Sequence, residues 1–450
     1  MRTLKAKIGS YQVLQTIAAD TPEIQALRSE DKSENDRIDT SLLAELAVER
    51  VDVLITEDRG LHRKAGRLGL SSRVFTIDAF LEKVTSENPD LADYKVLAVR
   101  KELFGNINLS DPFFDSFRED YQGFDRWFNK KSDEVAYICT AEDGSLVAFL
   151  YVKKESPGED YTDISPSFTR ATRLKIGTFK VVANGFKLGE RFLKIVFDNA
   201  MHLHVDEIYV TIFEKRPEQD RLIRLLEDWG FARYGTKSTS IGTELVLVRN
   251  FRPRADLSDP RRSYPFVSRH TRKFIVPIWP AYHTELLPDS ILKTESADDF
   301  VENRPNRNAI SKVYISRSIE RGLKTGDLIV FYRTSSSAGP AHYTSVATTF
   351  GVVQEIFDKI RSEGEFIELC RKRSVFTDQE LAEWWNWKPT SRPFVVNFLY
   401  VYSLPKRPIL SQLKEAGIVT SAPRGFELIS DAGLQALLHL SNADHSFIVD

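Results

Sequence analysis

Two β-rich runs joined by a turn and a helix constrain the fold of this chain more than any other feature. RLKIGTFKV at 173–181 alternates as a strand does, and EIYVTIF at 207–213 is a second strand candidate. The stretch between them has a helical apolar face formed by Leu188, Phe192, Ile195 and Val196. This order predicts an α/β domain.

The turn that leads into this helix has the composition of an anion site. It contains Gly185 and Gly189, and Lys187 adds a positive charge. Glycines leave backbone N–H groups open at the positive end of a helix dipole, where a pyrophosphate can bind. The same spacing taken alone is common in plain turns, so the surrounding elements decide its meaning.

The surrounding elements extend the pattern over residues 97–252. Residues 132–154 predict a hairpin around an Asp-Gly turn, and a later helix begins near Pro217 and ends at Gly230. The whole order resembles the GNAT superfamily of acetyl-CoA-dependent N-acetyltransferases. The resemblance implies the GNAT α/β acyltransferase fold, with acetyl-CoA held between the strand ending near Val181 and the strand at 207–213.

The resemblance also assigns residues to the cofactor. Those expected to contact acetyl-CoA are Phe179, Val181, Gly185, Phe186, Lys187, Leu188, Gly189 and Glu190. The loop departs from the family pattern, because Asn184 replaces the first basic or amide residue and Lys187 replaces the middle glycine. Backbone amides can bind a pyrophosphate despite both changes.

Catalytic residues are less clearly marked. The family often has a tyrosine that protonates the leaving thiolate at the position occupied here by Leu226. Tyr234 or Tyr209 could replace that tyrosine, and Glu214 or a water could accept the proton of the amine. A transferase of this kind can also work mainly by holding the two reactants together.

Residues 1–88 predict half of a doubly wound α/β unit. A helical stretch from residue 42 precedes a strand at 51–56, and a helix at 60–69, a strand at 73–76 and a helix at 77–84 follow.

Three aspartates give this segment a resemblance to the PIN family of metal-dependent ribonucleases. Asp36 and Asp39 open a helix, and Asp58 follows a strand. Such carboxylates can bind Mg²⁺ or Mn²⁺. The family's first strand, with its own aspartate, would lie upstream of Met1, which leaves the metal site incomplete. Alternatively, Asp39 caps a helix beginning at Thr40, and Asp58 caps one beginning near Gly60.

Residues 262–450 contain short β-rich runs divided by Gly, Pro and Asp, the pattern of a closed β-barrel with added helices. LKTGDLIVFY at 323–332 resembles the PUA-like superfamily, including its ASCH and EVE branches. The matching residues are Lys324, Gly326, Asp327, Tyr332, Gly351 and Val352. The resemblance implies binding of RNA or modified bases.

Aromatic residues in this segment suit base stacking and core packing about equally. They are Trp279, Tyr282, Tyr314, Tyr332, Trp384, Trp385 and Trp387. The preceding stretch, 249–273, has eight basic residues against two acidic ones and three prolines, which predicts a basic linker able to meet phosphates.

Composition sets the broad class. The chain of 450 residues carries 62 Lys and Arg against 64 Asp and Glu, a net charge of −2, with 42% hydrophobic residues. These values indicate a soluble globular protein. Only two cysteines, Cys139 and Cys370, occur, which fits a reducing cytoplasm, and no apolar run is long enough to span a bilayer.

These patterns lead to three functional hypotheses. The first is an acetyl-CoA-dependent N-acetyltransferase that acts on a primary amine, on aminoacyl-tRNA or on a protein, in a toxin–antitoxin or defence context with an antitoxin partner. The second is a non-catalytic protein that senses acetyl-CoA and binds nucleic acid. The third is a PIN-type ribonuclease, which requires sequence upstream of Met1.

Overall fold

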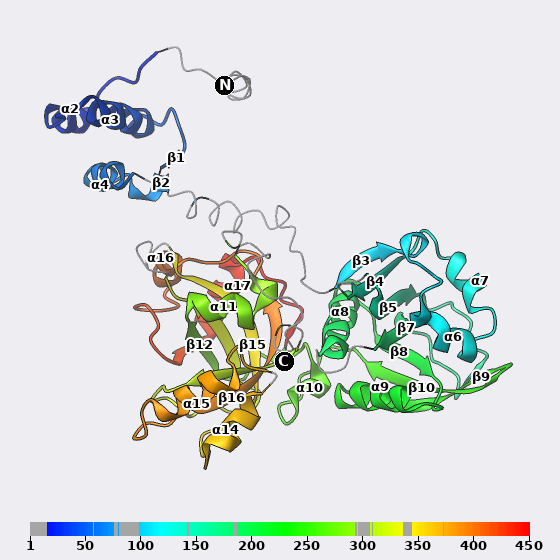
Figure 1. Ribbon diagram of the computed structural model, residues 1–450. Coiled ribbons are helices and arrows are strands. Elements are labelled where there is room, and N and C mark those ends of the chain that lie inside the picture. Colours follow the sequence, from blue (N-terminus) through cyan, green and yellow to red (C-terminus); the bar gives the residue numbers. More distant parts are fainter. Residues whose placement is uncertain are drawn as a thin grey trace. The chain divides into compact units, whose positions relative to one another are not determined.

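The structure is a computed structural model, and it describes residues 16–56, 58–75, 80, 99–141, 144–182, 187–292, 295, 307, 309–335, 344–371 and 373–450. The chain divides into two compact units, residues 1–87 and 88–450, whose elements are labelled in Figure 1. Within the described residues, no helix combines the length and the apolar character needed to cross a membrane.

The first unit is small. Its described elements are α2 (Pro22–Ser29), α3 (Glu34–Ala47), β1 (Leu54–Ile55), α4 (Arg59–Arg67), a 3₁₀ turn (Ser71–Arg73) and β2 (Val74–Phe75). β1 and β2 pair in parallel, as a doubly wound unit requires, but each has only two residues. This single short pair does not support the PIN-like unit predicted for residues 1–88. The predicted helix at 77–84 lies outside the described residues, apart from Phe80.

The second unit begins with an eight-stranded sheet, and residues 99–251 are called here the eight-stranded half. Its strands are β3 (Arg100–Leu103), β4 (Val135–Thr140), β5 (Leu146–Glu155), β6 (Ile164–Ser165), β7 (Arg173–Val181), β8 (Glu207–Ile212), β9 (Ala232–Thr239) and β10 (Gly242–Asn250). Their order is β3-β4-β5-β7-β8-β10-β9-β6. The central pair, β7 and β8, is parallel, because α8 (Leu188–His202) forms the crossover between them.

Helices cover both faces of this sheet. On β5, Ala148 and Leu150 pack in the same cluster as the apolar side chains of α8 and α9 (Pro217–Asp228). Phe149 and Tyr151 alternate with them and pack against α6 (Asp115–Asp120) and α7 (Phe124–Asn129). Fully burying one such aromatic side chain contributes about 1.5–3 kcal/mol. The alternation fixes which face of the sheet each side chain of β5 reaches.

Residues 260–450 form the six-stranded half. Its sheet contains β12 (Lys273–Ile278), β13 (Ser311–Ser316), β14 (Leu328–Arg333), β15 (Val346–Phe357), β16 (Phe394–Ser403) and β17 (Glu427–Ile429). The further elements are α10 (Pro260–Ser263), β11 (Val267–Ser268), α11 (Pro280–Leu286), a 3₁₀ turn (Pro288–Ser290), α14 (Glu363–Cys370), α15 (Asp378–Asn386), α16 (Leu410–Glu415), α17 (Asp431–Leu440) and β18 (Ile448–Val449), all found in Figure 1 by label or colour.

This second sheet is open, so the predicted closed barrel is wrong. The strand order is β13-β16-β15-β14-β12-β17, and the described end strands β13 and β17 do not pair. Side chains fill the space between those ends, since the Tyr314 ring lies 5.7 Å from the Phe426 ring. The Tyr314 hydroxyl donates a hydrogen bond of 2.5 Å to the carbonyl of Pro277. Aromatic packing therefore replaces the backbone ladder that would close a barrel.

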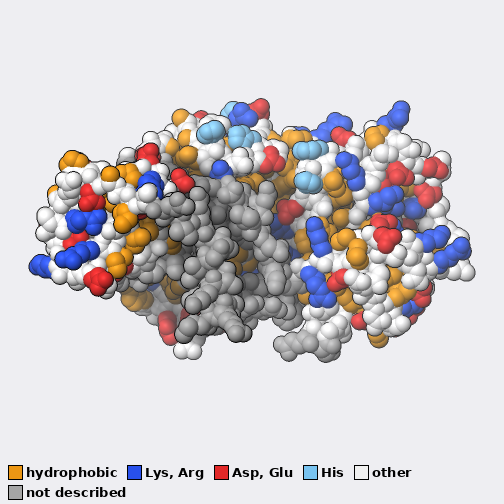
Figure 2. Space-filling view, turned by 90° about the horizontal axis from the view of Figure 1, so that it is seen from above, with side chains coloured by type: hydrophobic (Ala, Val, Ile, Leu, Met, Phe, Trp, Pro, Cys, Tyr) orange, Lys and Arg blue, Asp and Glu red, His pale blue; other side chains and the backbone are white. Residues whose placement is uncertain are grey.

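The predicted basic linker is packed structure over much of its length. Arg249 is 2% exposed, its guanidinium lies 4.1 Å from the Phe197 ring, and burial lowers its pKa to about 9. Arg272 pairs with Asp327 at 2.5 Å, and Lys273 pairs with Asp431. On the face drawn in Figure 2, basic and acidic side chains are interspersed. Each of these three basic residues therefore already has a partner within the folded protein.

One hydrophobic core joins the two halves. The largest cluster of buried apolar residues includes Phe197 and Trp229 from the eight-stranded half and Leu399 and Phe447 from the other. Tyr264 lies between them, with its ring 5.4 Å from both Phe197 and Trp229. Its hydroxyl donates to the carbonyl of Tyr400 at 2.8 Å. An interface of this kind is apolar and buried, like the interior of one domain.

Candidate functional site

The strands β7 and β8 part in the middle of the sheet. They are paired from Arg173 opposite Glu207 to Ile176 opposite Val210, and no parallel pair follows. β7 nevertheless continues to Val181 and β8 to Ile212. The backbone groups of β7 and β8 beyond these pairs therefore do not hydrogen-bond to each other. This is the place predicted from the sequence for acetyl-CoA.

A bulge in β7 coincides with this divergence. Tyr151 of β5 pairs with Thr178 and the next residue, Val152, pairs with Ile176, so Gly177 is an extra residue. A β-bulge bends its strand and increases the local twist. A Cβ atom on Gly177 would lie 2.6 Å from the Tyr151 ring, so only glycine fits. The bulge thus lies where the pairing of β7 with β8 ends.

The start of α8 retains the features of an anion site. Gly185 and Phe186 lie outside the described residues, but Lys187 to Glu190 are described. Lys187 is the N-cap residue, with a left-handed φ of 58°, and its side chain makes no capping hydrogen bond. The first intrahelical bond runs from the Arg191 N–H to the Lys187 carbonyl at 3.2 Å. The N–H groups of Leu188, Gly189 and Glu190 thus have no acceptor within the helix ladder.

Gly189 lets α8 approach α9 closely. A Cβ atom at this position would lie 2.8 Å from Leu225 of α9. Gly189 is partly exposed, whereas Leu188 beside it is buried. Gly189 therefore combines a packing role with an open backbone, and a large side chain would disturb both.

Phe179 and Val181, the predicted cofactor residues of β7, differ in burial and in contacts. The Phe179 side chain is 8% exposed and lies 5.5 Å from the Phe192 ring of α8. Val181 is partly buried and pairs with Ala148. Their side chains serve the core, so only their backbone could face a ligand between the strands.

Tyr209 lies at the base of the divergence. It is 1% exposed and sits opposite Lys175 in the last paired stretch of β7 and β8. Its hydroxyl donates to Glu155 at 2.7 Å, and the same carboxylate accepts from Tyr161 at 3.0 Å. Burial and the bond to Glu155 raise the pKa of Tyr209 above its usual value. Tyr209 is therefore a protonated donor at neutral pH.

The other two predicted catalytic residues have polar partners other than Tyr209. Tyr234 donates to the carbonyl of Ser167 at 2.9 Å. Glu214 forms an exposed ion pair with Arg233 at 2.9 Å. Leu226, where the family's tyrosine was expected, is fully buried in the core. Of the three predicted catalytic residues, Tyr209 has the environment best suited to hold a proton.

Sequence reasoning missed a second tyrosine–carboxylate pair. Tyr121 donates to Glu244 at 2.7 Å, and Glu244 is 3% exposed. The Tyr121 ring lies 5.4 Å from that of Phe213, the residue directly after β8. Burial and Glu244 raise the pKa of Tyr121. Tyr121 and Glu244 are 123 positions apart, so no local spacing signals this pair.

Two basic residues border the open ends of the strands. Lys180 of β7 donates to Ser116 at 2.7 Å, and burial followed by the charge of Arg216 lowers its pKa. Arg216 precedes α9 and pairs with Glu119 at 2.8 Å and Asp120 at 3.0 Å. The unpaired ends of β7 and β8 are thus bordered by Lys180 and Arg216.

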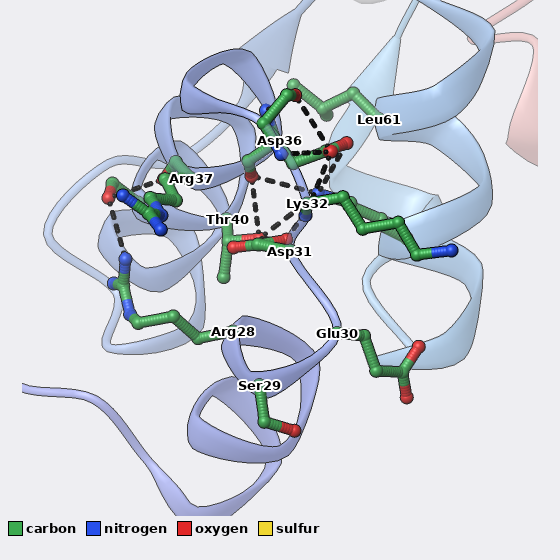
Figure 3. Close-up of polar contacts among 12 residues, drawn as sticks. Arg28, Ser29, Glu30, Asp31, Lys32, Asp36, Arg37, Thr40 and Leu61 are labelled. Atoms are coloured by element: carbon green, nitrogen blue, oxygen red, sulfur yellow. Dashed lines mark hydrogen bonds and ion pairs between the residues drawn. The ribbon is translucent and has the colours of Figure 1, made fainter.

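Two of the three aspartates predicted as metal ligands lie at helix starts. Asp36 and Ser33 form a capping box at the start of α3, where Figure 3 shows Asp36 among polar neighbours. Hydrogen bonds from Ser33 lower the pKa of Asp36, and Lys64 lies 3.6 Å from its carboxylate. Asp58 caps α4 by accepting from the amides of Gly60 and Leu61. Two of the three carboxylates therefore hold helix ends.

Asp39 does not complete a site with them. It lies inside α3 and caps no helix, because α3 begins at Glu34. Burial and then the charge of Asp58 raise its pKa. Among the residues that the structure describes, no three His, Cys, Asp or Glu side chains gather as metal ligands.

A pocket of about 640 Å³ opens in the six-stranded half. Its walls come from β13, the end of β12, α11, α15 and the residues just before β17, so it lies beside the gap between the two sheet ends. Five of the seven candidate stacking residues line it: Trp279, Tyr282, Tyr314, Trp384 and Trp387. Tyr332 and Trp385, at 1% and 6% exposure, belong to the core instead.

Arg317 gives this pocket a positive charge. Its guanidinium lies 5.7 Å from the Trp384 ring and 5.1 Å from the Trp387 ring. Burial and the neighbouring Arg392 and Arg321 lower its pKa. Trp279 and Trp387 are 71% and 74% exposed. Exposed indole rings beside a guanidinium suit a planar, electron-rich ligand.

The sequence pattern that suggested a PUA-like segment has a structural role. The Asp327 carboxylate accepts from the Lys324 amide at 2.6 Å and from Arg272. Gly326 takes the left-handed φ of 87° that the turn requires. A Cβ atom on Gly351 would lie 3.1 Å from the Leu399 carbonyl. This pattern therefore builds the sheet and does not line the pocket.

Comparisons with known proteins match parts of the chain. No family model matches, and no curated protein matches by sequence. Similar solved structures include ASCH from Zymomonas mobilis, at 14% identity, covering 37% of this chain and 94% of that one, with a TM-score of 0.27. Naa20 of Chaetomium thermophilum, in complex with a bisubstrate analogue, has 17% identity, 34% and 86% coverage and a TM-score of 0.27. An N-acetyltransferase from Staphylococcus aureus Mu50 has 10% identity, 34% and 97% coverage and a TM-score of 0.25.

Proposed function

We propose that the eight-stranded half is an acetyl-CoA-dependent N-acetyltransferase acting on a primary amine. The observation that carries this proposal is the end of β7–β8 pairing at Ile176 and Val210, in the sheet whose crossover helix begins at Leu188. A linear ligand can enter between unpaired strands and bond to their backbone, while its phosphates meet the helix N-terminus.

The residues present fit such a ligand. The first-turn amides of α8 lie next to Lys187, whose side chain is 30% exposed, and Gly189 leaves the backbone accessible. Acetyl-CoA supplies an activated thioester that an amine can attack. Lys187 and the amides of Leu188 to Glu190 bind the diphosphate, and the unpaired backbone of Gly177 to Val181 orients the chain that follows.

Two hydrogen-bonded tyrosine–glutamate pairs donate and accept the protons of the reaction. Transfer breaks the C–S bond and forms a C–N bond, so the amine loses one proton and the thiolate gains one. We assign proton donation to the Tyr209 hydroxyl, held by Glu155, in place of the tyrosine absent at Leu226. We assign proton acceptance to Glu244 through Tyr121. Tyr234 and Glu214 keep their present partners and are replaced in these roles.

Acetyl transfer is tested by mixing the full chain with acetyl-CoA and a panel of amines: aminoacyl-tRNA, peptides and polyamines. A mass increase of one acetyl group on an acceptor, with equal release of free thiol, is expected. Binding of CoA without turnover of any acceptor would favour the non-catalytic sensor. Absence of CoA binding would end both hypotheses for this half.

A second function is favoured by the pocket in the six-stranded half. We propose that it binds a nucleobase between its exposed indole rings, because each base offers a π-face and Arg317 adds a cation. This proposal supports an RNA-linked acceptor such as aminoacyl-tRNA. An antitoxin partner and a defence context stay predictions from the sequence.

Nucleobase binding is tested with single nucleotides and a short single-stranded RNA, read by quenching of tryptophan fluorescence. Saturable quenching that requires Trp387 is expected. Quenching unchanged in W387A would remove the pocket as the binding site.

A further inference from the structure

The first turn of α8 is anchored outside its own half. The Glu190 carboxylate accepts from the backbone amides of Ile310, at 3.1 Å, and Ser311, at 3.2 Å. Both amides belong to the six-stranded half, at the start of β13. The other oxygen of Glu190 accepts from Lys187 at 2.9 Å. One carboxylate thus links the N-cap residue of α8 to a strand more than 100 positions away.

The next residue makes a second link of the same kind. Arg191 forms a two-pronged ion pair with Asp289, with both N–O distances 2.7 Å. Arg191 is 5% exposed. Burial alone would raise the pKa of Asp289, but the charges of Arg191 and Lys194 outweigh it and hold that pKa below its usual value. Two-pronged pairs between charged groups are strong and fix geometry.

These links act on the part of the helix that is otherwise least stable. Helix ends fray, and the left-handed N-cap conformation of a lysine is strained. A binding turn that is already ordered loses less entropy when its ligand binds. Glu190 also carries a negative charge next to the anion site. Its hydrogen bonds with the β13 amides and Lys187 hold the carboxylate to one side of that site.

We infer that the six-stranded half positions the acetyl-CoA-binding turn of α8, with Glu190 and Arg191 as positioning residues. This inference rests on the proposed function. It makes acetyl-CoA affinity a property of both halves, although the predicted cofactor residues all lie in one of them.

The experiment measures CoA binding to full-length variants by calorimetry, at a temperature where circular dichroism shows each variant folded. E190A removes the acceptor of the two β13 amides, and D289N breaks the pair with Arg191. We expect CoA affinity to fall on the order of tenfold in each. Removing a negative charge from an anion site would by itself tighten binding, so a loss in E190A reports the lost anchoring.

Two further variants separate positioning from other effects. E190Q keeps an oxygen that can accept from Ile310 and Ser311, so we expect it to restore affinity to within about threefold of wild type. D198N removes a carboxylate that is 51% exposed and pairs with Lys194 at 2.6 Å on the same helix, and we expect no change. Faster hydrogen exchange of the amides at 188–191 is expected in E190A and D289N alone.

The possible failures are distinguishable. Folded E190A and D289N that bind CoA as the wild type does would overturn the inference and leave the proposed function standing. E190Q as weak as E190A would assign the effect to the pair with Lys187 and would also overturn it. A wild-type chain that does not bind CoA would overturn the proposed function itself.

Discussion

Two sheets of this protein each have a place where strands do not pair, and the two gaps differ in what lines them. In the eight-stranded sheet, neighbouring strands part beyond Ile176 and Val210, so the gap is bordered by backbone and by hydrogen-bonded tyrosines. In the six-stranded sheet, the end strands never meet, and aromatic side chains border the pocket. The proposed ligands differ accordingly: a linear ligand with hydrogen-bonding groups for the first gap and a planar ring for the second.

The largest expected effect comes from G189W. An indole at this position collides with Leu225 of α9 and covers the first-turn amides, so we expect CoA affinity to fall at least about 100-fold. Calorimetry measures the loss, while nucleotide quenching in the pocket should persist and serves as the folding control. Unchanged CoA affinity would remove the diphosphate from this turn.

Y209F tests the chemistry at the first gap. Losing the proposed proton donor should lower kcat about 100-fold, because general acid catalysis contributes on that order. CoA affinity should stay within twofold, since the phenylalanine ring still fills the same space. Y234F, which removes a hydroxyl bonded only to a backbone carbonyl in the described structure, is the matched control. Equal losses in both variants would contradict the assignment.

W387A tests the second gap. Removing one exposed stacking ring should weaken nucleotide binding about tenfold, given about 1–3 kcal/mol for a stacked base. Stability should barely change, because Trp387 is 74% exposed. I319A removes a fully exposed apolar side chain next to the pocket-lining Ser318 and should have no effect. If W387A also weakened CoA binding tenfold, the two gaps would not be separate sites.

The smallest effect is a pH dependence of stability. The pKa of Tyr209 is raised above 10 in the folded chain, so the contribution of this group is complete below pH 10 and is lost as pH rises toward the folded pKa. At pH 10.5 the unfolded tyrosine ionises in part, which lowers the free energy of unfolding by about 0.8 kcal/mol. Other tyrosines with raised pKa values also lose stability in this range, so denaturant unfolding at pH 8 and 10.5 should show a loss in wild type that exceeds the loss in Y209F by about this amount. An equal loss in both would show that Tyr209 is not the group responsible.

The sequence predicted the elements around the first gap better than those around the second. The strand–helix–strand order and the turn at Lys187 to Gly189 depend on neighbours along the chain, and the structure has the elements in the predicted order. The proton-handling pairs could not be found in this way, because Tyr121 and Glu244 are 123 positions apart. Leu226 shows the same limit, since its burial depends on the whole core.

The predicted closed barrel is wrong for a related reason. Strand patterns do not say whether the first and last strands meet, and here Tyr314 and Phe426 occupy the space between them. An aspartate at a helix start can be a metal ligand or a cap. Asp36 and Asp58 both cap helix starts. The alternative that Asp58 caps a helix is confirmed, whereas Asp39 caps none.

The sequence alone determined which segments become strands and helices and where a glycine-containing turn meets a helix, because periodicity and turn chemistry act over a few residues. Tertiary structure decided which strands pair and which carboxylates accept hydrogen bonds from tyrosine hydroxyls. It also decided that β13 anchors the start of α8 through Glu190. Those contacts join residues far apart in the chain, and only the packed core brings them within hydrogen-bonding distance.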